Sequence, residues 1–158
     1  MNNQIPQKYK KYIAIIFMIA IFFMADQYLK HLAVNKFSRQ SYNLISNFLT
    51  FSFTPNYYIA FSLPISGPFL NIVIALMIIG IFSYLIYSYR QQKNTLFLIG
   101  VLLILSGAIS NFLDRIISGY VIDYIYLKHF TVFNLADTYI FIGAITTLIS
   151  LNKKTELK

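Results

Sequence analysis

Residues 94–113 read NTLFLIGVLLILSGAISNFL, twenty positions without Asp, Glu, Lys or Arg. A helix that crosses the hydrocarbon core of a bilayer needs about 20 mostly apolar residues. The stretch therefore predicts a transmembrane helix. The whole chain agrees, since 58% of its 158 residues are hydrophobic and 11% are charged, with a mean hydropathy of +0.63. A soluble domain needs more charge than this to cover its surface.

Three further apolar stretches predict helices at about residues 12–29, 69–89 and 133–151, alongside the one at 95–113. The first could be a cleaved signal peptide, because lysines precede it. Its cleavage pattern is poor, since Phe23 would lie three residues before a cut after Ala25, so a retained helix is favoured. We expect one all-α membrane domain over residues 1–158, with four transmembrane helices.

The distribution of Lys and Arg predicts the orientation. The two termini and the second connection hold eight of these residues, whereas the first and third connections hold five. The positive-inside rule then places both termini in the cytoplasm. The net charge of +8 does not indicate a nucleic-acid partner, because no polar face carries it.

The first connection is nearly forty residues long and has a mixed pattern. Residues 44–54 alternate in a way that favours a strand, and Pro55 should end it. Pro64, Gly67 and Pro68 should then break the chain before the second helix. We expect a small extracytoplasmic β-sheet or lid between helices one and two.

The acidic residues are concentrated at one side of the membrane. Of five in the chain, four lie at the outer end of a predicted helix or in the third connection: Asp26, Asp114, Asp123 and Asp137. A carboxylate at membrane depth costs about 2.5–3.5 kcal/mol, so such groups usually face a partner or a cavity. Helical spacing puts Asp26 on one face with Lys30, and Asn134 on one face with Asp137.

Two carboxylates held close together share a proton, and such a pair can activate water and protonate a carbonyl. Other hydrolytic chemistries lack their motifs: the sequence has no cysteine, no His-Glu-x-x-His and no Gly-x-Ser-x-Gly. Polar residues at this depth also join helices or line channels. Spacing alone therefore leaves an enzyme, a transporter and a structural protein open.

Five short motifs help to decide between these three classes of protein. In chain order they are DQYLK (26–30), TPNYYIAFS (54–62), SGAISNFLDR (106–115), GYVIDY (119–124) and FNLAD (133–137). Their content and order resemble the bacterial lipoprotein signal peptidases, also called signal peptidase II. One such motif would be weak, but five in order over most of the chain are specific.

The resemblance implies roles for individual residues. The catalytic dyad would be Asp123 and Asp137, in the fourth and fifth motifs. Polar neighbours would position the substrate or the dyad: Asn56, Asn111, Arg115 and Asn134. Two supporting ion pairs are expected, Asp26 with Lys30 and Asp114 with Arg115, because polar pairs join spanning helices.

The resemblance also implies an activity. It is that of an aspartyl endopeptidase of the cell membrane, which cleaves prolipoproteins before a diacylglyceryl-modified Cys near the outer face. Lipidated prolipoproteins and membrane lipid would be its partners, globomycin its inhibitor, and no metal or organic cofactor would be needed. The alternatives are a non-enzymatic small transporter and a catalytically silent relative.

The motifs depart from the family pattern at three positions. Tyr58 stands where the family usually has Gly, and Ser106 and Ser110 replace glycines of the third motif. Gly gives backbone freedom that other residues lack. Because both dyad aspartates and their Asn neighbours are present, we expect a divergent member that keeps its activity.

Overall fold

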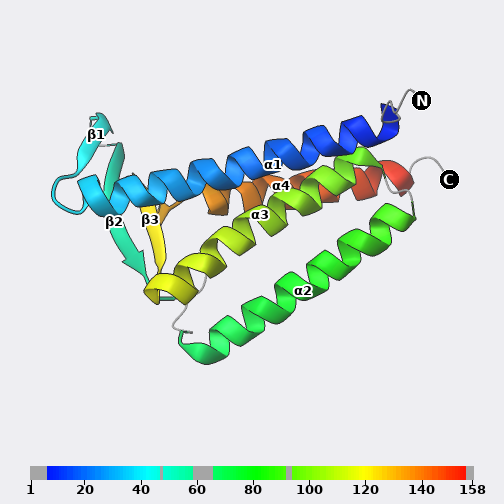
Figure 1. The fold of residues 1–158 in the computed structure, drawn as a ribbon. Helices are drawn as coiled ribbons and strands as arrows, with labels where there is room; N and C mark the ends of the chain where they lie inside the picture. Colours follow the sequence, from blue (N-terminus) through cyan, green and yellow to red (C-terminus); the bar gives the residue numbers. More distant parts are fainter. Residues whose placement is uncertain (1–6, 47, 59–65, 92–93, 156–158) are drawn as a thin grey trace, which may run out of the picture.

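The computed structural model describes residues 7–46, 48–58, 66–91 and 94–155. Its helices are α1 (Gln7–Leu32), α2 (Pro68–Arg90), α3 (Thr95–Ser118) and α4 (Leu135–Thr155), and a π-helical turn, Ala33–Phe37, extends α1. Its strands are β1 (Tyr42–Ile45), β2 (Leu49–Asn56), β3 (Val121–Leu127) and β4 (Val132–Phe133). The helices run lengthwise, with the sheet at one end of the molecule and both chain ends at the other (Figure 1).

Four helices of the described chain are long and apolar enough to cross a membrane, which confirms the expected fold class. Three of them differ clearly from the expected bounds. The first continues to Phe37. The third continues past residue 113 to Ser118. The last begins at Leu135, because Phe133 belongs to β4 and Asn134 precedes the helix.

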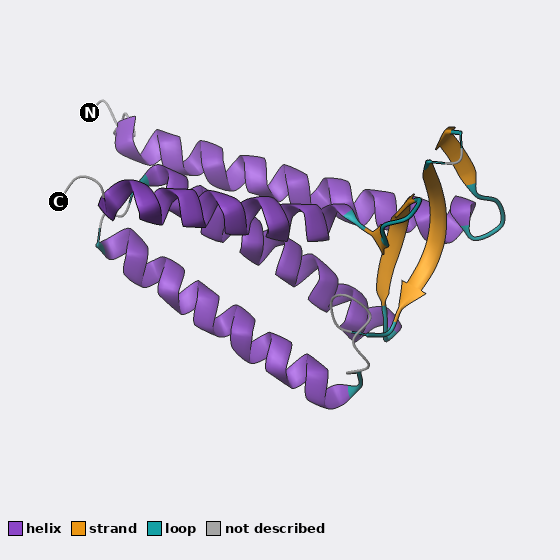
Figure 2. Cartoon of the chain, turned by 180° about the vertical axis from the view of Figure 1, so that it is seen from behind, coloured by secondary structure: helices purple, strands orange, loops and turns teal. Residues whose placement is uncertain are grey.

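The sheet confirms the expected strand region and is larger than expected. Its strands are antiparallel in the order β1-β2-β3-β4 and lie together at one end of the helices (Figure 2). Both β3 and β4 belong to the third connection, between α3 and α4. The residues expected to form one strand form a hairpin, with β1 and β2 on either side of a turn. Residues 59–65, where a lid was expected and where Pro64 falls, lie outside the described residues.

Pro55 does not end β2, contrary to expectation. The strand continues to Asn56, and Pro55 lies opposite Ile122 of β3. The pairing with β1 reaches only Phe51, so the missing N–H of Pro55 can face an open edge without breaking a ladder. Further on, Gly67, with φ of 82°, and Pro68 at the helix start turn the chain into α2 as expected.

Small residues bring α3 and α4 together. A Cβ added at Gly107 would lie 2.3 Å from the carbonyl oxygen of Ala136, and one added at Gly143 would lie 2.6 Å from that of Gly100. Inside lipid, such residues let helix backbones pack closely. The contact at Gly107 holds the first turn of α4 against α3. Gly119, with φ of 82°, then ends α3 and leads into β3.

Candidate active site

A bulge in β2 brings Asn56 to Asp123. Phe51 lies opposite Ile125 but Thr54 lies opposite Asp123, so two residues of β2 face Tyr124 alone. Side chains alternate between the faces of a strand, and the extra residue therefore moves Asn56 to the face of Asp123. Asn56 Nδ2 donates to Asp123 Oδ2 at 2.9 Å.

Asp137 is fixed by a reciprocal cap at the start of α4. Its backbone N–H donates to Asn134 Oδ1 at 2.9 Å, and its Oδ2 accepts the backbone N–H of Asn134 at 3.2 Å. This is a capping box, in which the residue before the helix and the third helical residue satisfy each other's amides. The spacing seen in the sequence thus orients a carboxylate as well as a helix end.

Asn134 also contacts the other expected dyad member. It is fully buried, and its Nδ2 donates to Asp123 Oδ1 at 2.8 Å. Asn111 completes the set, since its Nδ2 donates to Asp137 Oδ1 at 2.8 Å. Both carboxylates are therefore joined through Asn134, and neutral amides supply the hydrogen bonds to both.

This environment changes the acidity of Asp123. The side chain is 2% exposed, and burial, together with repulsion from Asp137, raises the pKa of Asp123 to about 7, although hydrogen bonds from Asn56 and Asn134 oppose the rise. A carboxyl group with a pKa near neutrality is present in both protonation states under working conditions. That is the property required of a general acid or base.

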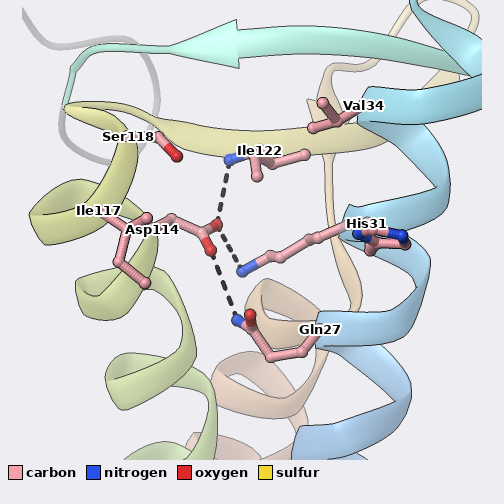
Figure 3. A pocket seen from close by; sticks show the side chains of 8 residues that line it. Gln27, His31, Val34, Asp114, Ile117, Ser118 and Ile122 are labelled. Carbon is pink, nitrogen blue, oxygen red and sulfur yellow. Dashed lines mark hydrogen bonds and ion pairs between the residues drawn. The ribbon is translucent and has the colours of Figure 1, made fainter.

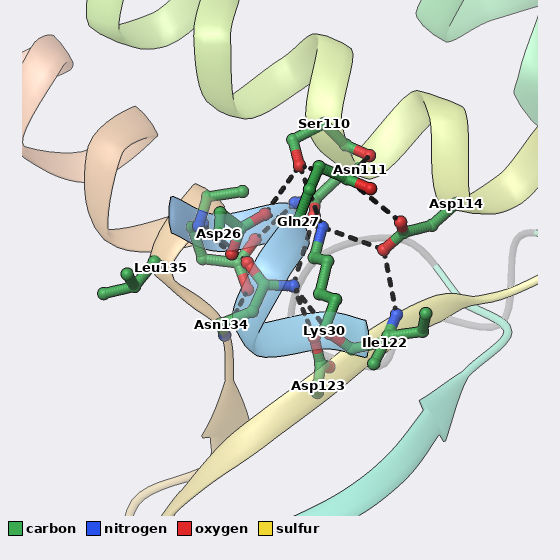
Figure 4. A network of polar contacts seen from close by, with 12 residues as sticks. Asp26, Gln27, Lys30, Ser110, Asn111, Asp114, Ile122, Asp123, Asn134 and Leu135 are labelled. Carbon is green, nitrogen blue, oxygen red and sulfur yellow. Dashed lines mark hydrogen bonds and ion pairs between the residues drawn. The ribbon is translucent and has the colours of Figure 1, made fainter. Parts of the chain in front are cut away.

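A second carboxylate pair lies beside the first and is built around a cation (Figure 4). Lys30 Nζ lies 2.9 Å from Asp26 Oδ2 and 2.8 Å from Asp114 Oδ2, and all three residues are buried. Asp114 was expected to pair with Arg115, and this is corrected: its cation is Lys30. Successive residues on a helix point in different directions, so Asp114 faces α1, where Lys30 lies.

The same cluster caps α4. Asp26 Oδ1 accepts the Ala136 N–H at 3.1 Å and the Tyr124 hydroxyl at 3.0 Å. Tyr124 Oη in turn accepts the Leu135 N–H at 3.1 Å. The first amides of a helix have no partner within it, and here side chains satisfy three in succession, counting that of Asp137. Burial raises the pKa of Tyr124 above its ordinary value, so its hydroxyl stays protonated.

Sequence reasoning missed three members of this network: Gln27, Ser110 and Tyr124. Ser110 Oγ donates to Asp26 Oδ2 at 2.6 Å and accepts from Gln27 Nε2 at 2.8 Å. The available signals were weak. Tyr124 follows Asp123, so in a strand it faces the other way, and Ser110 stood out only as a departure from Gly.

Comparisons with known proteins agree on one family. The family described as Signal peptidase (SPase) II matches residues 18–153.

The chain belongs to the signal peptidase II family.

Lipoprotein signal peptidases from several bacteria are similar to it. That of Chlorobium phaeobacteroides (strain BS1) is 35% identical over 149 residues, covering 85% of this chain and 92% of the relative. That of Streptococcus thermophilus (strain CNRZ 1066) is 31% identical over 146 residues, covering 90% and 92%. A bacterial membrane enzyme solved at 2.3 Å resolution by the in meso method has a TM-score of 0.80 and 27% identity, covering 92% of this chain and 91% of its own.

Signal peptidase II enzymes are aspartyl proteases, so the chain is a membrane-bound enzyme of this class. Family membership favours the enzyme over the transporter or structural protein that spacing alone left open.

Arg115 contacts the chain that follows β2. Its Nη2 donates to the carbonyl of Tyr58 at 2.8 Å, and its Nη1 donates to the carbonyl of Asn111 at 3.3 Å. Tyr58 uses its backbone for this contact, and its side chain is 44% exposed. A bulky residue therefore fits at this usual Gly position. The adjoining motif residues 59–62 lie outside the described part of the chain.

A pocket of about 200 Å³ lies between α1 and α3 (Figure 3). It is lined by Gln27, Lys30, His31, Val34, Asp114, Ile117, Ser118 and Ile122. Neither Asp123 nor Asp137 contributes to its wall. A peptide in this pocket would meet the ion cluster and miss Asp123 and Asp137, the two carboxylates of the expected dyad.

Proposed function

We propose that the protein removes signal peptides from prolipoproteins by hydrolysis, with Asp123 and Asp137 as the catalytic dyad. One observation carries the proposal: Asn134 bonds to both carboxylates at 2.8 Å and 3.2 Å, and no cation of the described chain forms an ion pair with either. Both acids therefore remain available to exchange protons.

The reaction follows general acid–base chemistry. The dyad holds one proton between its two carboxyl groups. The ionised group takes a proton from a water molecule, whose oxygen attacks the scissile carbonyl, while the protonated group donates its proton to the carbonyl oxygen. Collapse of the tetrahedral intermediate moves a proton to the leaving amine. One water is consumed, and a new carboxylate and a new amine are released.

The substrate is a prolipoprotein that carries a diacylglyceryl group on the Cys after the scissile bond. Its two acyl chains would hold that Cys at the membrane interface. A site at the sheet end of the helices can act at that depth. The Lys and Arg bias supports cytoplasmic termini, so the sheet end with the dyad would lie at the outer face. Globomycin is the expected inhibitor.

The test uses purified protein in lipid vesicles with a diacylglyceryl-modified prolipoprotein. We expect Asp123→Asn and Asp137→Asn each to lower kcat by about 100-fold or more, because each removes a proton-transfer group. Asn43→Ala on the exposed strand β1 is the control and should retain normal turnover. Normal processing by both dyad variants would contradict the proposal. A folded wild-type protein without activity would indicate a silent relative.

A further inference from the structure

Asn111 of α3 connects the ion cluster with the dyad. Its Oδ1 accepts from Lys30 Nζ at 2.9 Å and from Asn134 Nδ2 at 3.1 Å. Its Nδ2 donates to Asp137 Oδ1 at 2.8 Å. The side chain is 9% exposed, so water has little access to replace these partners.

The two ends of this amide are not interchangeable. A lysine ammonium only donates hydrogen bonds, so the Asn111 group that faces Lys30 must be the carbonyl. Turning the amide by half a rotation would set its NH2 against the Lys30 ammonium and the Asn134 NH2. It would also set its carbonyl against the Asp137 carboxylate. Leaving buried donors and acceptors unmatched costs about 1–3 kcal/mol each.

We propose that Lys30 is a positioning residue of the reaction, which acts through Asn111 and keeps an N–H donor directed at Asp137. This role rests on the proposed function and adds to the support that Lys30 gives the fold. An N–H donor stabilises the ionised form of a carboxyl group, and a carbonyl in its place stabilises the protonated form. Lys30 thereby keeps Asp137 able to accept a proton from water.

Charge alone is a competing explanation, because several ionisable groups surround the site. They are Asp26 and Lys30 on α1, Asp114 and Arg115 on α3, Asp123 and Tyr124 on β3, and Tyr139 on α4. Among them, Lys30 with its two carboxylate partners carries a net charge of minus one. An experiment that holds this charge constant separates the two explanations.

The decisive pair of variants is Asp114→Asn and the double variant Lys30→Met with Asp114→Asn. The double variant lacks the bond to Asn111 but keeps the net charge of minus one, on Asp26. We expect the acidic limb of its pH profile of kcat/KM to lie about one pH unit above that of wild type. At pH 6 its kcat/KM should be about tenfold lower. Asp114→Asn keeps the Lys30–Asn111 bond, and its acidic limb should not rise.

An acidic limb of the double variant that coincides with wild type would overturn the positioning role while leaving the proposed function intact. Absence of wild-type cleavage overturns both. Should the double variant fail to fold, Asn111→Leu provides the second test, since it keeps both ion pairs of Lys30 and removes the donor to Asp137. Its acidic limb should rise as well, and an unchanged profile would overturn the proposal.

Discussion

The two aspartate pairs at the sheet end lie side by side and are held in opposite ways. Asp26 and Asp114 share a buried lysine at 2.9 Å and 2.8 Å. Asp123 and Asp137 receive hydrogen bonds from asparagines and a backbone amide. A cation stabilises the ionised form of a carboxylate, so the first pair is suited to support the fold. The second pair, without a direct cation, can share a proton and is suited to chemistry.

The two environments separate the buried acids that serve stability from those that serve activity. Removing one partner of a buried ion pair leaves an uncompensated charge, and the loss of stability is large. Removing the charge of an acid held by neutral donors relieves a desolvation cost. Four experiments test this contrast, from the largest expected effect on stability to the smallest.

The strongest test compares Asp26→Asn with Asp137→Asn. We expect Asp26→Asn to lower the free energy of unfolding by about 3 kcal/mol, because it breaks a buried ion pair and sets an NH2 group against either the Lys30 ammonium or the donors that Asp26 caps at the start of α4. Asp137→Asn should change it by less than about 1 kcal/mol, since much of its cap is retained. Denaturant unfolding in detergent micelles measures both. Equal destabilisation by the two substitutions would remove the distinction between the pairs.

A second test displaces the dyad without touching a charge. A Cβ at Gly107 meets the Ala136 carbonyl at 2.3 Å, so Gly107→Ala should push the first turn of α4 outward. We expect a loss of about 1–3 kcal/mol in stability and a drop in kcat. Gly80→Ala on α2 is the matched control, because a Cβ there meets nothing within 4 Å. If both variants behave alike, close packing at Gly107 does not position Asp137.

A third test uses pH. The pKa of Asp123 is raised from 3.8 to about 7 on folding, so between these values the folded protein keeps a proton that the unfolded chain loses. Stability from this group is therefore present at low pH and falls as pH rises toward 7, by roughly 2–3 kcal/mol between pH 5 and pH 7.5. In Asp123→Asn that fall should disappear, as thermal unfolding at pH 5 and pH 7.5 will show. A wild-type stability that instead increases over this range because of Asp123 would contradict the assignment.

The smallest effect separates two serines of α3. Ser110 Oγ donates to Asp26 and accepts from Lys30 at 3.2 Å, whereas Ser106 Oγ is buried without a hydrogen-bond partner in the described structure. Ser110→Ala should cost about 1 kcal/mol, and Ser106→Ala should be neutral or slightly stabilising. Unfolding of the two variants in parallel measures the difference. No measurable loss in Ser110→Ala would show that Ser110 adds nothing to the ion cluster.

The sequence predicted the parts of the fold that depend on local pattern. Apolar length predicted the helices, and spacing along one helix predicted that Asn134 would lie next to Asp137. It did not predict that β3 joins the sheet, because strand pairing depends on contacts between residues far apart in the chain. For the same reason, the prediction from sequence wrongly paired Asp114 with its neighbour Arg115, whereas the structure pairs it with Lys30. Helical spacing shows which residues share a face, and it does not show which helix lies opposite.

The bulge in β2 absorbs one residue of the chain ahead of Asn56. Pairing of the same chain without a bulge from Phe51 onward would set Phe53 opposite Asp123 and turn Asn56 to the reverse face of the sheet. Deleting one residue between Phe51 and Thr54 would instead keep Thr54 opposite Asp123 and Asn56 on the same face, now on a regular strand. Natural variation in this strand should therefore tolerate the loss of one residue at the bulge.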